Sequence, residues 1–381
     1  MIQGYATRDG TLRFRVRHEG KDTAIGHFKE FQTLSLTSIG IGTYLGNADS
    51  TTDKLVVNAI KRSVSSGAVN VIDTAINYRF QKAERAVGRA VRELIEEKII
   101  SRDEIFISTK NGYLTHDADI AMDFWEYIHE HLIKKGVITA NDISSDYNCI
   151  KVSYLDDQLN RSIKNLGLEC IDLMYLHNVI ESNIHDLGRD ETMKMLKEAF
   201  EFYEQKRREG IIRYYGMATW TCFRVMPNSK EYVNLKYLVD MAKEASLKQS
   251  MSKDEHGFRF IQLPFNLIMH EAATLRNQSI NSNGSKNIMY TPFEVASILG
   301  VNVFTSVPLM QKRLLNSNIV PTIDGIESKA LRCLQFVRSS PAIPLVGYKT
   351  PEHVEENIKI AKVKPLSKDE FNDMVARLVN T

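Results

Sequence analysis

The feature that most constrains the fold of this chain is a regular alternation of short apolar stretches with longer amphipathic ones. Eight apolar stretches are rich in β-branched residues, as buried parallel strands are, and they cover residues 38–43, 69–73, 104–110, 170–177, 212–219, 259–266, 301–309 and 343–348. The stretches between them carry apolar residues at helical spacing. Eight strand–helix repeats predict an α/β protein with a (β/α)8 barrel of the TIM type.

An open, doubly wound sheet is the alternative arrangement of such repeats. That fold has a glycine-rich turn, GxGxxG, after its first strand, whereas residues 40–42 here read only Gly-Ile-Gly. Composition does not change along the chain, so residues 1–381 are expected to form a single barrel domain. Two parts fall outside the repeats, namely an N-terminal β extension over residues 1–35 and an insertion over residues 111–152.

These two parts are interpreted from local patterns. The N-terminal part is expected to be β structure because Asp9-Gly10 is a hairpin signal and residues 12–17 alternate apolar with basic side chains. The insertion is too long for an ordinary connection and follows a barrel strand, so it belongs to the active-site face. Its residues Phe124, Trp125 and Tyr127 are candidates to cover a substrate pocket, with Trp125 as a predicted substrate contact. A structural flap or an oligomer contact is the alternative.

Composition excludes several classes of function. The 381 residues are 43% hydrophobic and 25% charged, with a net charge of +2, so neither nucleic acid nor a membrane is an expected partner. The four cysteines are scattered and the N-terminus has no apolar signal core, which predicts a reduced protein in the cytoplasm. His, Cys and carboxylate residues do not cluster with the spacing of metal ligands. An organic cofactor is therefore expected rather than a metal.

Four reactive side chains fall at or just after the ends of three consecutive strands. Asp73 ends the strand over residues 69–73 and Tyr78 follows it, Lys110 ends the next strand, and His177 ends the one after. Taken singly, each could be an ordinary capping or surface residue. The carboxyl ends of barrel strands meet at one rim, so their joint occurrence predicts one catalytic site.

These four groups make a coherent acid–base system. A phenol ionises near pH ~10, which is too high for an efficient proton donor at neutral pH. A neighbouring ammonium, Lys110, favours the phenolate and lowers the pKa of the phenol, and Asp73 can supply the counter-charge that a buried ammonium needs. Tyr78 is then the proton donor, and His177 can hold a carbonyl oxygen beside it.

Several motifs resemble those of the aldo-keto reductase family. They are residues 73–78 (Asp-Thr-Ala-Ile-Asn-Tyr), 108–110 (Ser-Thr-Lys) and 172–177 (Asp-Leu-Met-Tyr-Leu-His), and the likeness runs from about Leu36 to Asn357. The resemblance implies the barrel fold and a cofactor, NADPH or less often NADH, bound without a dinucleotide-binding domain. It also implies the catalytic residues Asp73, Tyr78, Lys110 and His177.

The resemblance further implies a cofactor site on the residues that match the family's contacts. Gln262 matches the glutamine that holds the nicotinamide carboxamide, and Tyr44 is also expected to contact the substrate. Ser306 begins a pattern that in the family begins with an aromatic residue stacked on nicotinamide, and Phe304 and Trp220 are candidates to replace it. The predicted cofactor contacts are Gly42, Thr43, Tyr44, Asp73, Thr219, Gln262, Ser306, Leu309, Gly347, Lys349, His353 and Asn357.

The end of the site that holds the adenosine phosphate is expected after the strand over residues 343–348. Thr350 and Pro351 begin a helix whose N-terminus would attract phosphate. His353 stands where many relatives carry an arginine for the 2′-phosphate, and Lys349 is the fixed positive charge nearby in sequence. NADPH is the expected cofactor, and NADH is the alternative.

The sequence thus predicts a carbonyl reductase in which hydride passes from nicotinamide to an aldehyde or ketone and Tyr78 protonates the oxygen. The substrate is a small-molecule carbonyl compound whose identity, like the oligomeric state, the sequence leaves open. A cofactor-sensing, largely non-catalytic regulatory subunit on the same barrel is the alternative, because the resembled family includes channel-associated subunits.

Overall fold

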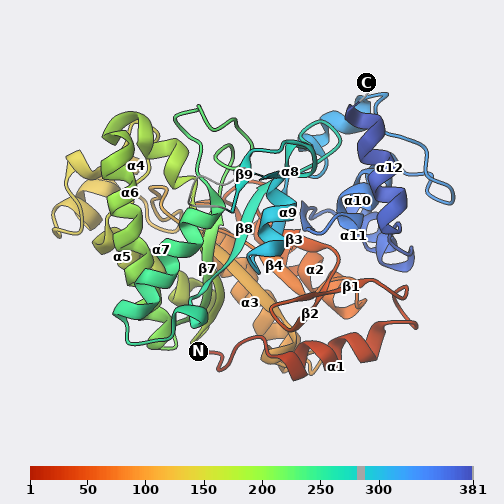
Figure 1. The fold of residues 1–381 in the computed structure, drawn as a ribbon. Helices are drawn as coiled ribbons and strands as arrows, with labels where there is room; N and C mark the ends of the chain where they lie inside the picture. Colours follow the sequence, from red (N-terminus) through yellow and green to blue (C-terminus); the bar gives the residue numbers. More distant parts are fainter. Residues whose placement is uncertain (281–287, 380–381) are drawn as a thin grey trace.

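The computed structural model of the protein describes residues 1–280 and 288–379, and a closed barrel of eight parallel strands lies at its centre (Figure 1). The strands follow one another around the barrel in chain order. They are β3 (Gly40–Gly42), β4 (Val71–Asp73), β5 (Phe106–Asn111), β6 (Ile171–His177), β7 (Ile212–Ala218), β8 (Phe258–Pro264), β11 (Asn302–Ser306) and β12 (Ile343–Gly347). The prediction of a (β/α)8 barrel is confirmed, and an open doubly wound sheet is excluded.

Helices surround the barrel, and several begin at the capping residues that the sequence provides. Asp49 accepts a hydrogen bond from the Thr52 N–H at the start of α2, and Thr291 and Glu294 form a capping box at the start of α9. The longer helices are α2 (Ser50–Ser65), α3 (Lys82–Glu96), α5 (Val152–Leu166), α6 (Val179–Arg208), α7 (Leu235–Lys248), α9 (Pro292–Ile298), α10 (Lys329–Ser339), α11 (Pro351–Ile358) and α12 (Lys368–Val379).

One helix differs from its predicted extent. The sequence pattern predicts a helix that begins at Thr192, whereas α6 begins at Val179 and is broken at Gly188, whose φ is 75°. Only glycine adopts that region without strain. The first part of α6 therefore lies directly after β6, next to the rim of the barrel.

The interior of the barrel is filled by side chains, so it is a packed core and not a channel. Phe260 lies at the centre of an aromatic group, with ring centroids 5.5 Å from Phe106 and 5.7 Å from Phe304. The other strand residues of this inner core are Val71, Leu173, Tyr175, Ala218, Ile343 and Leu345. A ligand can therefore reach the barrel strands only at their ends.

The N-terminal extension is not the all-β segment that the sequence predicts. Residues 8–18 form a helix, α1 (Arg8–His18), which begins where Thr7 accepts a hydrogen bond from the Gly10 N–H at 3.0 Å. Its buried side chains include Thr11, Phe14 and His18, which recur every three or four residues. That spacing is the period of a helix, and the alternation of basic residues that suggested a strand is only the exposed pattern.

The rest of the extension is the β hairpin β1 (Phe28–Phe31) and β2 (Leu34–Thr37), so the β prediction holds for this part. Phe31, Leu34 and Leu36 belong to the inner core of the barrel together with Val71, the first residue of β4. The hairpin therefore closes the N-terminal end of the barrel, and the carboxyl ends of the strands form the open end.

The insertion over residues 111–152 has a small core of its own. It contains the short helix α4 (Phe124–Ile128), a π-helical turn η2 (His129–Ile133) and a 3-10 turn η3 (Ala140–Asp142). Its buried apolar residues are Leu114, Tyr127, Ile128, Leu132, Ile138 and Cys149, joined by Tyr154 of α5. The insertion is thus a packed addition to the rim and is drawn beside α5 and α6 in Figure 1.

The remaining short elements complete the connections. They are η1 (Arg102–Glu104), η4 (Lys253–Glu255), α8 (Glu271–Thr274), η5 (Met310–Asn316), η6 (Lys359–Lys362) and the paired strands β9 (Gln278–Ser279) and β10 (Met289–Tyr290). The run of polar residues over 277–285 predicts a loop, but its first part contains β9, and its last part lies outside the described residues. Within residues 1–280 and 288–379, helices long and apolar enough to cross a membrane do not occur.

Candidate active site

Three of the four predicted catalytic side chains come from neighbouring strands and point inward for the same reason. Val71 in β4 belongs to the inner core, and successive inward positions of a strand are two residues apart. Asp73 therefore also points inward, at the carboxyl end of β4. The same period turns Lys110 of β5 and His177 of β6 toward the mouth of the barrel.

The floor of the site is a buried ion pair. Lys110 is fully buried, and its Nζ donates to Asp73 Oδ2 at 2.5 Å and to the Thr74 carbonyl at 2.8 Å. The other carboxylate oxygen of Asp73 accepts hydrogen bonds from Ser108 Oγ at 2.7 Å and from Gln262 Nε2 at 3.3 Å. Both charges are therefore paired and hydrogen-bonded, as buried charges must be.

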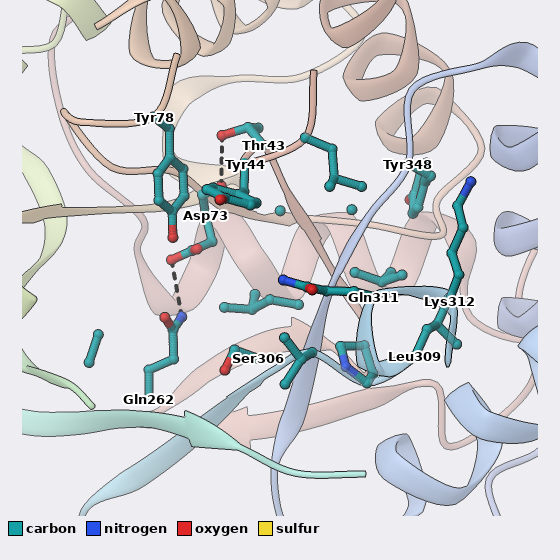
Figure 2. A pocket seen from close by; sticks show the side chains of 18 of the residues that line it. Thr43, Tyr44, Asp73, Tyr78, Gln262, Ser306, Leu309, Gln311, Lys312 and Tyr348 are labelled. Atoms are coloured by element: carbon teal, nitrogen blue, oxygen red, sulfur yellow. Dashed lines mark hydrogen bonds between the residues drawn. The ribbon is translucent and has the colours of Figure 1, made fainter. Parts of the chain in front are cut away.

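Tyr78 lies directly above this ion pair. Lys110 Nζ is 4.9 Å from the centroid of the Tyr78 ring, and Figure 2 shows the Tyr78 hydroxyl directed toward Asp73. The ring of Tyr44 lies 5.0 Å from that of Tyr78, and the ring of His177 lies 5.9 Å from it. The structure thus brings together all four predicted catalytic residues, with Tyr44 beside them.

The charges of the site are set by burial and by the ion pair. Burial raises the pKa of Tyr78, and the opposing effect of Lys110 only reduces that rise. Burial lowers the pKa of Lys110, but Asp73 more than offsets it, so the pKa lies above its ordinary value. Burial and then Lys110 lower the pKa of His177 well below its ordinary value. At neutral pH Lys110 is therefore an ammonium, Tyr78 a neutral phenol and His177 a neutral imidazole.

The raised pKa of Tyr78 corrects one part of the interpretation of the sequence. The sequence predicts that Lys110 lowers the pKa of Tyr78, and the effect of the lysine has that sign. The net direction is nevertheless upward, because removing the phenol from water opposes its ionisation more strongly.

An elongated cavity of about 470 Å³ opens above these residues. Among the predicted contacts, those that line it are Gly42, Thr43, Tyr44, Asp73, Tyr78, His177, Thr219, Gln262, Ser306, Leu309, Gly347, His353 and Asn357. Lys110 lies under the cavity floor. Lys349 does not line the cavity, so the prediction that it contacts the cofactor is not supported by its position.

The cavity wall has the features that a dinucleotide needs. Thr219 Oγ1 and Asn357 Oδ1 are buried and have no hydrogen-bond partner within the described part of the chain. Buried polar atoms of this kind normally bind something. Gln262 Nε2 is already held by Asp73, which leaves its carbonyl oxygen to accept from an amide. These residues fit a nicotinamide dinucleotide that runs from Gln262 toward α11.

The far end of the cavity carries a cation that sequence reasoning missed. Lys312, in η5, lines the cavity together with Gln311, and both have left-handed backbone conformations with φ of 71° and 52°. Figure 2 shows Gln311 extending into the middle of the cavity and Lys312 at its far side. Non-glycine residues rarely adopt such φ values, so the local sequence pattern gave no signal for this turn.

Of the two candidates to stack on nicotinamide, Phe304 and Trp220, only Trp220 lines the cavity. Phe304 belongs to the inner core of the barrel, in contact with the rings of Phe31 and Phe260, and does not line the cavity. Trp220 does line it and is 44% exposed. Because Phe304 is packed inside the barrel, it is excluded as the residue that stacks on nicotinamide. Ser306 lies on the cavity wall but has no aromatic ring.

The insertion contributes to the cavity through a residue other than those predicted. Tyr127 is buried in the core of the insertion, and Trp125 is 51% exposed beside Phe124 and away from the cavity wall. The position of Trp125 thus gives no support to the predicted substrate contact, because the residue does not line this cavity. Tyr113 lines the cavity instead, and its place three residues after Lys110 was the available signal.

A sequence model of the aldo/keto reductase family matches residues 38–378, and the chain belongs to this family of oxidoreductases. A Bacillus subtilis (strain 168) protein named uncharacterized oxidoreductase YqkF is similar to it, with 22% identity over 352 residues that cover 89% of this chain and 91% of the relative.

Solved structures of the same fold include other members of the family. An aldo/keto reductase from Klebsiella pneumoniae, crystallised with NADP and acetate, has a TM-score of 0.58 and 18% identity, covering 93% of this chain and 96% of its own. The aldo-keto reductase AKR11C1 from Bacillus halodurans, in its holo form, has a TM-score of 0.56 and 16% identity, covering 91% and 93%. At these identities the likeness establishes the fold alone.

Proposed function

We propose that this protein is an NADPH-dependent carbonyl reductase that acts on an aldehyde or ketone. The observation that carries the proposal is the buried Asp73–Lys110 ion pair beneath Tyr78, with His177 beside it at the mouth of the barrel. Membership of the aldo/keto reductase family supports oxidoreductase chemistry. NADPH, when bound, supplies the hydride that reduces the carbonyl carbon.

Tyr78 is the proton donor in this proposal. Burial keeps the phenol protonated at neutral pH, so the donor carries its proton when the substrate binds. As negative charge develops on the carbonyl oxygen, Tyr78 donates this proton, and the ammonium of Lys110 stabilises the phenolate that forms. Asp73 keeps Lys110 charged and in position.

His177 orients the carbonyl oxygen. Its imidazole is neutral at physiological pH because its pKa is lowered by burial and by Lys110. A neutral imidazole donates one hydrogen bond and does not compete with Tyr78 as a strong acid. The ring of His177 is edge-on to that of Tyr78, and in this proposal both groups donate to the same carbonyl oxygen.

The cofactor is held by residues along the whole cavity. Gln262 and Thr219 face the carboxamide end, and Asn357 faces the adenine end. Lys312 and His353 line the same far end and favour the 2′-phosphate of NADPH over the hydroxyl of NADH. The NADP and NADPH complexes of the Klebsiella pneumoniae relatives support this choice.

The test is the loss of NADPH absorbance with a panel of reactive aldehydes, measured for the wild type and for Tyr78→Phe. We expect turnover by the wild type and a decrease of about 10²–10⁴-fold in the variant, the usual contribution of a general acid. Equal rates would refute the role of Tyr78. Tight NADPH binding without turnover of any carbonyl compound would favour the cofactor-sensing subunit instead.

A further inference from the structure

The part of the cavity next to Tyr78, which we call the substrate end, is polar but carries no unpaired charge among the described residues. The charged residues of the cavity wall other than Asp73 are Lys312, His353 and Glu356, which belong to η5 and α11 at the far end, and Asp73 is paired with Lys110. Figure 2 shows Lys312 across the cavity from Tyr78. The substrate end is lined by Tyr44, Asn77, Tyr78, Tyr113, His177, Asn178 and Trp220.

Tyr113 is a fixed part of this end. Its ring lies edge-on to His177 with a centroid distance of 5.0 Å. Its hydroxyl donates to Asp146 Oδ2 at 3.0 Å, lies 3.1 Å from Ser182 Oγ and accepts a hydrogen bond from Asn178 Nδ2 at 3.2 Å. Because these bonds occupy the hydroxyl, Tyr113 presents its ring, not its oxygen, to a ligand.

Two further rings form the open side of the substrate end. Trp220 is 44% exposed and Tyr44 is 59% exposed, so both can bury apolar surface when a ligand binds. The backbone at Trp220 is rigid, because Glu181 Oε1 accepts hydrogen bonds from the N–H groups of Trp220 at 2.8 Å, Thr221 at 2.7 Å and Cys222 at 3.1 Å.

Glu181 also gives this region a negative charge. Its second oxygen, Oε2, is buried without a hydrogen-bond partner, and Glu181 forms no ion pair within the described ranges. A carboxylate in such surroundings acts over a longer range than one in water. The carboxylate of Asp146 lies behind Tyr113 with the same sign. An anionic ligand at the substrate end would therefore lie near the Glu181 carboxylate, whereas the neighbouring cation Arg224, which donates to the Trp220 carbonyl, is paired with Glu271.

From these observations we propose that the substrate end selects uncharged carbonyl compounds with a planar, apolar group next to the carbonyl, such as aromatic aldehydes. Carbonyl compounds with a carboxylate or phosphate near the reacting group are rejected. This specificity rests on the proposed reductase function and adds the substrate class to it. Tyr113, Trp220 and Tyr44 contact the apolar group, and Glu181 disfavours the anion.

The experiment compares two aldehydes of similar size, methyl 4-formylbenzoate and 4-carboxybenzaldehyde, of which the second carries a carboxylate at neutral pH. We expect kcat/KM to be at least about tenfold higher for the neutral ester, since unfavourable like-charge contacts are the main means of rejecting a ligand. Equal values, or a preference for the carboxylate, would overturn the specificity while leaving the reductase intact. Absence of turnover with both would overturn the proposed function and this inference with it.

A pair of variants separates the charge from the shape of the site. Glu181→Gln keeps an oxygen for the three N–H groups but removes the negative charge, and we expect it to decrease the ester-to-acid ratio of kcat/KM about threefold or more. Asp186→Asn removes an exposed carboxylate five residues further along α6 and is the matched control, for which the ratio should stay constant. The same ratio in the wild type and in folded Glu181→Gln would refute the electrostatic part.

The apolar part is tested at Tyr113. We expect Tyr113→Ala to raise KM for benzaldehyde about tenfold, as loss of a large buried ring does, and to raise KM for propanal much less. Tyr113→Phe, which keeps the ring, should restore most of the difference. A uniform loss of kcat with both aldehydes in Tyr113→Ala, with KM unchanged, would assign the residue a structural role and contradict the proposed contact.

Discussion

Two lysines of this protein are shielded from water, Lys110 completely and Lys29 in part, but of the two only Lys110 has a charged partner among the described residues. Lys110 lies at the open end of the barrel, and its Nζ contacts the carboxylate of Asp73. Lys29 belongs to the hairpin at the closed end, and its Nζ donates to the carbonyl oxygens of Ser340 and Ala342, each at 2.6 Å. The Lys110 amine therefore contacts a full negative charge, whereas the Lys29 amine contacts only the dipoles of backbone carbonyl groups.

The pKa values follow this difference. Asp73 raises the pKa of Lys110 above its ordinary value despite burial. Burial, assisted by the nearby guanidinium of Arg338, lowers the pKa of Lys29 to about 7. An ion pair between Lys29 and an acidic residue does not occur in the part of the chain that the structure describes. The two lysines lie at opposite ends of the barrel, with Lys110 fully buried and Lys29 half-buried, and the more deeply buried one keeps its charge because a carboxylate contacts it.

Lys110 and Lys29 differ in whether their local function needs a positive charge. A neutral amine can still donate two hydrogen bonds, which is all that the backbone carbonyl groups near Lys29 require. Stabilising a phenolate requires a charge, and only Lys110 is built to keep one across the physiological pH range. A buried ion pair is costly to desolvate, so its presence under Tyr78 is itself an argument that the charge has a use.

The largest effect should come from removing the charged lysine. We expect Lys110→Met to decrease kcat/KM for an aldehyde by about 10²–10⁴-fold, because Tyr78 loses the group that stabilises its phenolate. Lys29→Met is the matched control and should keep wild-type activity. Steady-state kinetics on both variants, with circular dichroism to verify folding, make the test. Comparable losses of kcat/KM in Lys110→Met and Lys29→Met would show that the reaction does not specifically require the charge of Lys110.

Removing the carboxylate should make Lys110 resemble Lys29. In Asp73→Asn the lysine keeps its burial but loses its counter-charge, so its pKa should fall below the ordinary value. The ammonium is then lost at a lower pH, and the alkaline limb of the kcat/KM profile should shift to lower pH than in the wild type. We also expect a loss of about 3 kcal/mol in unfolding free energy. Profiles that coincide from pH 6 to 10 would contradict this account.

The barrel and the paired lysine could be predicted from sequence because both depend on short-range rules. Strand and helix periods identify the repeats, and an alternation of two residues carries Asp73 and Lys110 to the mouth once their strands are known. Lys29 was not singled out, because its environment depends on Ser340 and Ala342, more than 300 residues away. The helix α1 was missed because a two-residue charge alternation concealed its buried face.

The cavity wall could be predicted only in part, for a related reason. Residues at strand ends, such as Gln262 and Gly347, lie where the sequence predicts. Lys312 replaces Lys349 on the wall because a left-handed turn redirects the chain after β11. Tyr113 lies on the wall in place of Trp125, which is exposed against Phe124 and Tyr147 on the insertion. Loop conformation is set by tertiary contacts that no local pattern contains.

Lys29, the lysine without a charged partner, should change how the unfolding free energy depends on pH. Lys29 has a pKa of about 7 when folded and ~10.4 when unfolded, so the unfolded chain binds more protons between these values. The unfolding free energy of the wild type should therefore rise relative to that of Lys29→Met as pH increases, by about 2 kcal/mol from pH 7 to 9.

Lys110 should affect the pH dependence of the unfolding free energy differently from Lys29. Its folded pKa is raised, so its contribution to stability is present below the unfolded value of ~10.4 and is lost only above the folded pKa. Between pH 7 and 9, Lys110→Met should differ from the wild type by a constant amount. Guanidinium unfolding at pH 7, 8 and 9 measures all three proteins, and parallel curves for the wild type and Lys29→Met would refute the depressed pKa.

The smallest effect is expected at a third lysine, which is exposed. Lys312 lies on the cavity wall in water, where an ionic contact is worth little. If it faces the 2′-phosphate, Lys312→Ala should raise the Kd of NADPH about two- to fivefold and leave the Kd of NADH unchanged, as measured by quenching of protein fluorescence. Lys349→Ala, which removes a lysine outside the cavity wall, is the control. Equal changes for both cofactors would place the 2′-phosphate elsewhere and leave His353 as its remaining candidate.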